Sequence, residues 1–336
     1  MFNPRYRITN YFVKCCEKIA SRNNEIKHAG IALPLHVRLE REFVNRSVHS
    51  STWIEGNRLS FDQVVALAAN KNIIAQEDQK LEVGNCMKAV KWILKTKNQR
   101  LTEKRILKVH EMMTNGLLAP ENCGKYRRVQ NYVVNAKNVV IFTPPQPQKV
   151  AQRMSELLRW IKISQEEHPI VISAVFHHEL VTIHPFVDGN GRVARAASQG
   201  LLFEKGYDPL HTLSLDDFFA GDRGRYYHMI QQARDMDGDY TYWIDYVAEG
   251  LLDAVSKIYH RLKTVKRIKG VEKIALTPKQ EELLKLLSGH DVMGSAQICK
   301  YMKINRARVN QLIAPLVKAG VVTKQGTTRA VRYRLA

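Results

Sequence analysis

A histidine, a carboxylate, two glycines and two arginines lie close together in the segment from His184 to Arg195. His184 can accept a proton near neutral pH and return it later, so it is the candidate general base. Gly189 and Gly191 allow the backbone to approach a phosphate closely, and Asp188 supplies a carboxylate suited to a phosphate-bound magnesium ion. The segment therefore predicts a site for a polyphosphate.

The residues around these glycines are predicted to be helical, over 176–183 and again over 193–204. Free N–H groups and the dipole at the start of the second helix favour an anion. Arg192 and Arg195 are three positions apart and share a face, so their planar guanidinium groups can bind successive phosphates. Asn190 is expected to tolerate a left-handed backbone and to donate its side-chain amide.

Two other phosphate or metal motifs fail on spacing. No Gly-x-x-x-x-Gly-Lys-Ser/Thr sequence follows a strand, which excludes a P-loop. His178 and His184 are six positions apart and face different ways, whereas zinc proteases need histidines four apart on one helix. His177 and His178 are therefore predicted to be packing or surface residues.

The elements that must position this segment are mostly helical. Apolar residues recur at helical intervals through most of the chain. Two β-forming runs, over 129–134 and 139–142, interrupt them and are separated by residues 135–138. We predict one helix that ends at Glu55 and is stopped by Gly56, and Thr102 as the cap of another. The predicted helices and hairpin cover residues 35–55, 61–116 with two interruptions, 129–142 (the hairpin), 150–163 and 169–260.

A separate module is predicted to begin near Thr277. Three helices, over 278–287, 295–302 and 305–319, precede two strands, over 321–324 and 331–335, which is a winged-helix arrangement. The predicted fold is thus mainly α, with a helical core, a β-hairpin flap and a C-terminal winged helix-turn-helix domain. The predicted divisions are an N-terminal helical region (1–70), a core (71–256), a basic linker (257–275) and the winged-helix domain (276–336).

The residues 184–195 read His-Pro-Phe-Val-Asp-Gly-Asn-Gly-Arg-Val-Ala-Arg, which resembles the signature His-Pro-Phe-x-x-Gly-Asn-Gly-Arg-x-x-Arg of the Fic family. The resemblance extends to Gly124-Lys125-Tyr126-Arg127 and the hairpin after it, and covers residues 35 to 250. It implies a helical core that binds Mg²⁺ and ATP. It also implies a protein adenylyltransferase, which transfers AMP to a Ser, Thr or Tyr hydroxyl of a target protein and of the enzyme itself.

The resemblance further implies a role for each matched residue. His184 would be the general base, and Phe186 would anchor the loop in the core. The target protein would dock on the hairpin flap at 129–143, by adding a strand to its edge. The nucleotide contacts would come from one loop and the helix after it: Asp188 with magnesium, Gly189, Asn190 with the α-phosphate, Gly191, and Arg192 and Arg195 with the β- and γ-phosphates.

The resemblance also bears on the type of reaction and on where adenine binds. Gly191 matters because family members that transfer phosphate itself carry Lys at this position. Adenine would lie against an aromatic side chain, and Tyr226, Tyr227 and Trp243 fall where family members often place such residues.

The sequence Ser51-Thr52-Trp53-Ile54-Glu55-Gly56 resembles the inhibitory Ser/Thr-x-x-x-Glu-Gly/Asn motif of one class of Fic proteins. In that class the glutamate pairs with the second arginine of the signature and blocks the γ-phosphate. The resemblance therefore implies that Glu55, supported by Ser51 and Gly56, pairs with Arg195 and inhibits the enzyme.

The composition sets wider limits. A formal net charge of +20 predicts attraction to phosphate-bearing partners. The five scattered cysteines contain no Cys-x-x-Cys pair and are read as reduced thiols. No apolar run is long enough to span a bilayer, and the first residues lack the apolar region of a secretory signal, so a cytoplasmic location without membrane contact is expected.

The sequence leaves other functions open. The protein could be a DNA-binding transcription regulator with a Fic-like sensor core, and the same module could equally dock a protein. The enzyme could instead remove AMP or transfer another nucleotide. A homodimer is also open. The basic residues expected on the third helix and wing of the module are Arg306, Arg308, Lys318, Lys324, Arg329, Arg332 and Arg334.

Overall fold

The protein is mainly helical, as predicted. The computed structural model describes residues 2–28, 33–134, 137–208, 210–267, 277–288, 290, 292–318, 321–326 and 331–335. The helices are α1 (Asn10–Lys27), α2 (Leu33–Ile54), α3 (Phe61–Ala68), α4 (Glu77–Lys95), α5 (Glu103–Thr114), α6 (Pro147–Ile163), α7 (Pro169–Ile183), α8 (Asn190–Glu204), α9 (Leu215–Gly221), α10 (Arg223–Asp235), α11 (Thr241–Arg267), α12 (Pro278–Ser288), α13 (Ser295–Met302) and α14 (Arg306–Lys318). The strands are β1 (Val133–Val134), β2 (Val140–Phe142), β3 (Met293–Gly294), β4 (Val322–Gln325) and β5 (Arg332–Leu335).

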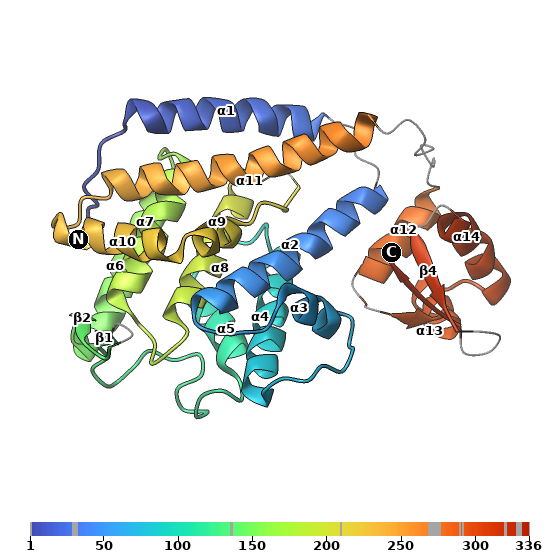
Figure 1. Cartoon of the computed structure of the whole chain (residues 1–336), viewed down its shortest axis with the longest axis horizontal. Helices are drawn as coiled ribbons and strands as arrows, with labels where there is room; N and C mark the ends of the chain where they lie inside the picture. The colour runs from blue at the N-terminus through green and yellow to red at the C-terminus, as the bar shows by residue number, and fades with distance from the viewer. Residues whose placement is uncertain are drawn as a thin grey trace.

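Helices α7 and α8 form the centre of the core and carry the two ends of the 184–195 segment (Figure 1). Helix α7 is buried on nearly every side, because α6, α8 and α11 all pack around it. This explains its continuous apolar sequence, since a helix without a solvent face has no need of a polar stripe. The loop between α7 and α8 is thus held by two helices that have little freedom to move.

Helix α1 lies beside α11 along one edge of the core, and the sequence analysis missed it (Figure 1). Its buried side chains include Phe12, Cys15, Ile19 and Ile26, which recur at the spacing of one helical face. Thr9 caps the helix by accepting a hydrogen bond from the Phe12 N–H at 3.0 Å. The signal was therefore present in the residues.

The hairpin is shorter than predicted. Strands β1 and β2 pair antiparallel, with Val133 opposite Phe142. The residues from Val129 to Tyr132 lie outside the strand, because side chains rather than a neighbouring strand take up the local carbonyl groups. The Arg127 guanidinium donates to the Val129 carbonyl at 3.0 Å. The turn residues 135 and 136 lie outside the described residues.

The C-terminal module has its own hydrophobic cluster, which includes Leu283, Ile298, Val309 and Tyr333. Helices α12, α13 and α14 lie near the predicted positions, and the sheet has the order β3-β5-β4. The short strand β3 was not predicted. The assignment of this module as a winged helix, like the exact division of the chain into domains, stays a prediction.

The first part of the predicted linker is helical. Helix α11 continues to Arg267, so residues 257–267 belong to it, and the remaining linker residues 268–275 lie outside the described residues. Leu262 is buried in the core cluster, and Arg261 forms an ion pair with Glu42 of α2 at 2.7 Å. Lys257 and Lys263 of this stretch lie on the exposed side of α11. None of the described helices is long and apolar enough to cross a membrane.

Candidate functional site

The loop between α7 and α8 changes direction at two left-handed residues. His184 ends α7 with a φ of 51°, and its N–H donates to the Leu180 carbonyl at 2.9 Å. Gly189 begins α8 with a φ of 83°, a conformation that costs glycine little. Because Pro185 cannot continue a helix, the chain leaves α7 at once and returns at Gly189. The N-terminus of α8 thus opens onto this loop.

Asn190 holds the loop closed, which corrects the expected free amide. Its Oδ1 accepts the Phe186 N–H and its Nδ2 donates to the Phe186 carbonyl, both at 2.9 Å. The side chain is only 3% exposed. The left-handed residues of the segment are His184 and Gly189, while Asn190 is the first residue of α8. One of its two amide N–H groups is therefore already used by the Phe186 backbone, and the left-handed conformation that Asn190 could tolerate is adopted by Gly189 instead.

Phe186 fixes the loop to the core, through a residue that the sequence analysis did not single out. Its ring is fully buried and stacks on the ring of His110, with centroids 3.8 Å apart. His110 accepts the Gly124 N–H at Nδ1 (2.9 Å), so its proton sits on Nε2, which donates to the Asp188 carbonyl at 3.0 Å. Burial lowers the pKa of His110 to about 4, so the ring stays neutral and this arrangement holds across physiological pH.

Arg127 ties the hairpin to the loop. Its side-chain Nε donates to the His184 carbonyl, and its backbone N–H donates to the Pro185 carbonyl, both at 2.8 Å. A further hydrogen bond reaches the Pro145 carbonyl, just after β2. The side chain is 2% exposed, so these carbonyl groups solvate a buried guanidinium. The flap is thus attached to the residue that carries the candidate base.

The His184 imidazole is oriented by the end of its own helix. Its Nδ1 lies 3.2 Å from the Val181 carbonyl, which can only accept, so Nδ1 carries the proton and Nε2 keeps its lone pair. Burial lowers the pKa of His184, and the charges of Arg234 and Arg127 lower it further. The ring is therefore neutral at pH 7, which is the form that can accept a proton.

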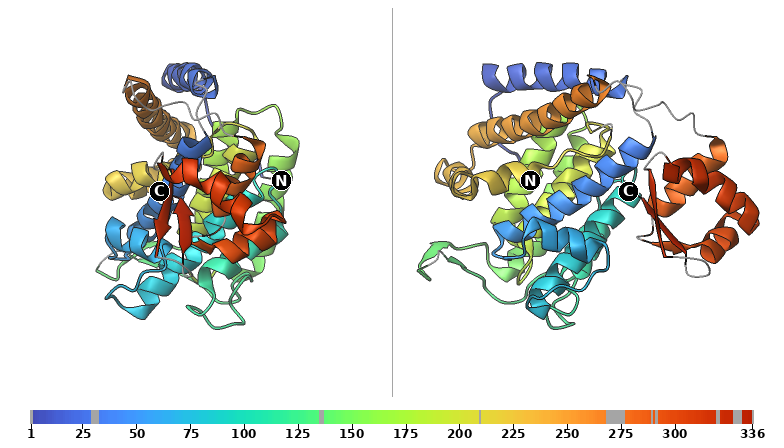
Figure 2. Two further views of the ribbon diagram at one scale, coloured as in Figure 1. Left: turned by 90° about the vertical axis from the view of Figure 1, so that its right-hand side faces the viewer. Right: turned by 45° about the vertical axis from the view of Figure 1, so that its right-hand side comes forward.

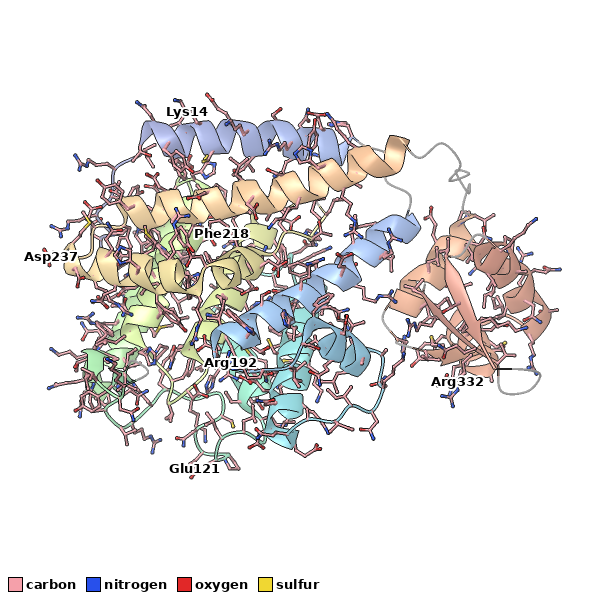
Figure 3. The ribbon with its side chains drawn as sticks, viewed as in Figure 1. Lys14, Glu121, Arg192, Phe218, Asp237 and Arg332 are labelled. Atoms are coloured by element: carbon pink, nitrogen blue, oxygen red, sulfur yellow. The ribbon has the colours of Figure 1, made fainter. Side chains whose placement is uncertain are left out.

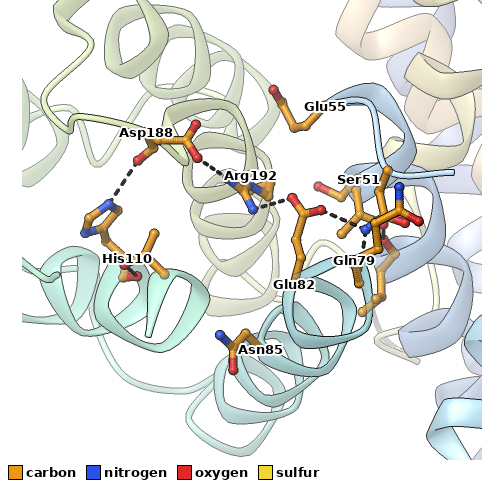
Figure 4. Close-up of polar contacts among 12 residues, drawn as sticks. Ser51, Glu55, Gln79, Glu82, Asn85, His110, Asp188 and Arg192 are labelled. Atoms are coloured by element: carbon orange, nitrogen blue, oxygen red, sulfur yellow. Dashed lines mark hydrogen bonds and ion pairs between the residues drawn. The ribbon is translucent and has the colours of Figure 1, made fainter. Parts of the chain in front are cut away.

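Arg192 is buried between two carboxylates, one of which the sequence analysis missed. Its side chain donates to Asp188 Oδ2 at 2.8 Å and forms a short ion pair with Glu82 of α4. Glu82 in turn accepts a hydrogen bond from the Asn57 amide at 2.7 Å. Figure 4 shows this chain of contacts, and Figure 3 places Arg192 among the core helices. Nothing in the sequence pattern around Glu82 indicates this contact.

Arg195 is completely enclosed and makes the contact with Glu55 that the sequence predicts. One guanidinium nitrogen lies 2.7 Å from Glu55 Oε1, and the group also donates to the Ser51 hydroxyl and carbonyl, both at 2.9 Å. A second carboxylate, Asp216 of α9, lies 3.3 Å away and was not predicted. Burial disfavours the charge on Arg195, but Glu55, the Tyr226 hydroxyl and Asp216 outweigh it and raise the pKa of the guanidinium.

Gly191 leaves room for the glutamate. A Cβ at this position would collide with Glu55 Oε1 and would lie 3.0 Å from the Arg195 guanidinium. Gly56 has a φ of 106° and turns the chain directly after α2. The two glycines therefore allow the end of α2 to approach the start of α8 as closely as the ion pair requires.

Two of the three aromatic candidates for adenine are core residues. Tyr226 is 1% exposed and shares its hydroxyl between His177 (2.9 Å) and Arg195 (3.3 Å). Trp243 is fully buried and donates to the Ala174 carbonyl at 2.7 Å. Neither ring can stack on a base, so these two assignments were wrong. Tyr227 is 41% exposed, and its hydroxyl donates to the Ile54 carbonyl at 3.3 Å.

The neighbouring histidines have structural roles. His177 and His178 are both buried, and His178 bonds to the Ile230 carbonyl at 2.9 Å. Burial lowers the pKa of each ring, to about 3 for His178. Their prediction as packing residues agrees with this geometry.

A single carboxylate faces solvent at the loop. The Asp188 side chain is 64% exposed, and one of its oxygens contacts Arg192. Among the described residues no three His, Cys, Asp or Glu side chains gather into a metal-binding group. One carboxylate beside a phosphate site suits Mg²⁺, which takes few protein ligands and completes its shell with phosphate oxygens and water.

Residues 100–202 match the model of the Fic/DOC family. This segment is a Fic domain. It contains α5, the hairpin, α6, α7 and most of α8, so the 184–195 loop and its supports His110 and Arg127 all belong to it.

The chain is also similar to curated proteins named protein adenylyltransferase Fic. That of Culex quinquefasciatus is 30% identical over 219 residues, which are 63% of this chain and 41% of the relative. That of Nematostella vectensis is 29% identical over 224 residues, 65% of this chain and 49% of the relative. The chain thus spans less than half the length of these relatives.

Solved structures support the fold. A Fic family protein from Desulfovibrio desulfuricans G20 matches with a TM-score of 0.68 and 24% identity, covering 100% of this chain and 98% of that one. Fic-1 from C. elegans matches with a TM-score of 0.63 and 24% identity, covering 76% of this chain and 73% of that one. The first likeness extends over the C-terminal module as well as the Fic domain.

Proposed function

We propose that this protein transfers AMP from ATP to a hydroxyl group of a target protein and of itself. The proposal rests on one observation: a single loop brings together a neutral histidine with a free Nε2 lone pair, an exposed carboxylate and two buried arginines at a helix N-terminus. Nucleotidyl transfer needs these parts, because it depends on positioning and charge stabilisation. The relatives named adenylyltransferases support the same activity.

In this reaction the target hydroxyl oxygen bonds to the α-phosphorus while His184 Nε2 takes its proton. The bond from the α-phosphorus to the bridging oxygen breaks, and pyrophosphate leaves. Arg192 and Arg195 would bind the β- and γ-phosphates, while the N–H groups at the start of α8 would face the α-phosphate. Mg²⁺, held by Asp188, would supply further positive charge to the phosphates. Tyr227 is the remaining aromatic candidate for contact with adenine.

We propose the hairpin as the docking site for the target. Four of its apolar side chains are exposed, Val134, Val139, Val140 and Ile141, while Val133 and Phe142 are half-buried. An exposed edge of this kind can take up an extended segment of another protein. Arg127 donates to the His184 carbonyl in the loop and to the Pro145 carbonyl at the end of the hairpin. It would therefore keep a segment docked on the hairpin at a fixed position relative to His184.

We further propose that Glu55 inhibits the enzyme. Arg195 is buried and has its donors on Ser51, Glu55 and Tyr226. A γ-phosphate and the Glu55 carboxylate would need the same guanidinium edge, and two anions cannot share it without strong repulsion. ATP would therefore bind in its reactive pose only after Glu55 has left.

Replacing the base should separate transfer from binding. His184→Ala should lower the rate of AMP transfer about 10²–10⁴-fold, because the hydroxyl loses the group proposed to take its proton. ATP affinity should change little, since His184 acts on the target. Transfer of labelled AMP and binding of a non-hydrolysable ATP analogue measure the two effects. Near-normal transfer in the folded variant would remove His184 from this role.

The pH profile should report the lowered pKa of His184. The base acts when neutral, so the rate should fall as pH drops through its pKa, and the midpoint of that fall should lie below the usual 6.5. Arg234→Gln removes a neighbouring positive charge and should move the midpoint to higher pH. Both profiles are best measured with Glu55→Gly, which takes inhibition out of the comparison. A midpoint at or above 6.5 would contradict the assignment.

Removing the glutamate should activate the enzyme. Glu55→Gly should raise self-labelling with ATP, because Arg195 loses its internal anion and can bind phosphate. Adding Arg195→Ala in the same chain should lower labelling again. Glu17→Gly, at an exposed position of α1 away from the loop, is the matched control and should leave the rate near that of wild type. An unchanged rate for folded Glu55→Gly protein would sink the inhibitory role.

A further inference from the structure

The C-terminal module contains a strongly cationic segment. From residue 292 to residue 336 the chain has nine Lys and Arg residues and no Asp or Glu. Five exposed cations belong to its last helix and its hairpin: Arg306, Arg308, Lys318, Lys324 and Arg332. Within the described residues none of these five forms an ion pair. Their charges are therefore uncompensated by the described part of the protein.

These charges lie on a helix and a strand that pack together. Arg306, Arg308 and Lys318 belong to α14, and Lys324 belongs to β4, which lies against α14. Arg332, labelled in Figure 3, is on the neighbouring strand β5 and pairs with Gln325, so its side chain points to the other side of the sheet from Lys324, which pairs with the buried Tyr333. In Figure 1, α12 is turned toward α2, whereas α14 lies on the outer side of the module. We call α14 with β4 the outer basic face.

We propose that the outer basic face binds duplex DNA. Helix α14 has 13 residues and is about 20 Å long, a rod that fits the major groove. Asn310 and Gln311 are exposed in its middle, where their amides can reach base edges, while the cations at its ends and on the hairpin meet phosphates. A membrane is a poor fit, because Tyr301 is the single exposed large apolar side chain among the described residues of the module.

The test measures binding of a fluorescent 20-base-pair duplex of mixed sequence to the full-length protein over a range of salt. Wild type should bind at low salt, with affinity falling steeply as salt rises. Arg306→Gln with Arg308→Gln should weaken binding about tenfold or more and reduce the salt slope by about 2, one for each cation removed from a phosphate. Circular dichroism verifies folding.

A charge-matched double variant is the control. Arg100→Gln with Lys104→Gln removes two exposed cations from the core instead and should change affinity less than twofold. Equal loss in both double variants would overturn the proposal, since only net charge would then matter. No duplex binding at low salt would also overturn it. So would tighter binding to phosphatidylserine vesicles or to a poly-glutamate peptide that depends on Arg306 and Arg308.

The module also contacts the core, through α12 and the end of β5. Helix α12 packs against α2, and Val37 of α2 is buried in the hydrophobic cluster of the module. Arg41 of α2 donates to the Leu335 carbonyl of β5 at 3.0 Å. The same helix ends at the residues that contact Arg195. Figure 2 shows α2 reaching from the core to the module.

We infer that the docked module restrains α2 and so strengthens inhibition by Glu55, an inference that rests on the proposed function. Val37 and Glu55 are 18 positions apart, about 27 Å along a continuous helix, which transmits a shift at one end to the other. When the module holds one end of α2, less conformational entropy is lost as Glu55 binds Arg195 at the other end.

Loosening the contact should raise activity only where inhibition operates. Val37→Ser should increase self-labelling several-fold in the wild-type background and leave the Glu55→Gly protein unchanged. Arg38→Ser, exposed on the adjacent position, is the control and should have no effect. If Glu55→Gly raises labelling and Val37→Ser does not, the restraint is wrong. If Glu55→Gly itself has no effect, the proposed inhibition fails instead.

Discussion

The site depends on one buried charge. Arg195 is 3% exposed, and a guanidinium without water requires anions and acceptors around it. The protein supplies Glu55 and Asp216 as anions and Ser51 as an acceptor. Asp216 is held on the core side, and burial raises its pKa to about 6 although Arg195 opposes this. Glu55 is the more exposed of the two carboxylates, so under the proposed inhibition it is the partner that a phosphate would replace.

The loop itself is rigid, which separates the geometry of catalysis from its control. Asn190 fixes the Phe186 backbone, Phe186 stacks on His110, and His110 holds the Asp188 carbonyl. Each contact is buried, so moving one member would leave a polar group unpaired or a cavity open. Occupancy of the site is therefore better changed by shifting α2 than by reshaping the loop.

Features that depend on local sequence pattern, such as helices and caps, could be predicted from the sequence. Contacts between residues far apart in the chain could not. The helices other than α1 and the cap at Thr102 follow from spacing and residue type, whereas the role of Phe186 as an anchor came from the resemblance. The contact of Glu55 with Arg195 came from resemblance, since a pair 140 positions apart leaves no periodic trace. Glu82, Asp216 and His110 support the site from separate helices, and each looked like an ordinary helix residue. Helix α1 had a readable pattern and was overlooked.

Asn190 and Tyr226 illustrate why residue type alone assigns too much. An amide beside two glycines suggests a ligand contact, yet a loop that turns twice must also satisfy its own backbone, and Asn190 is the nearest group that can. An aromatic residue near a nucleotide site suggests stacking, yet Tyr226 is needed to complete the shell of Arg195. In both cases the polar group is already hydrogen-bonded within the protein, Asn190 to the loop backbone and Tyr226 to the buried Arg195. In the proposed reaction the nucleotide would therefore meet the backbone N–H groups of α8, Arg192, the arginine that Glu55 occupies, and the exposed carboxylate of Asp188.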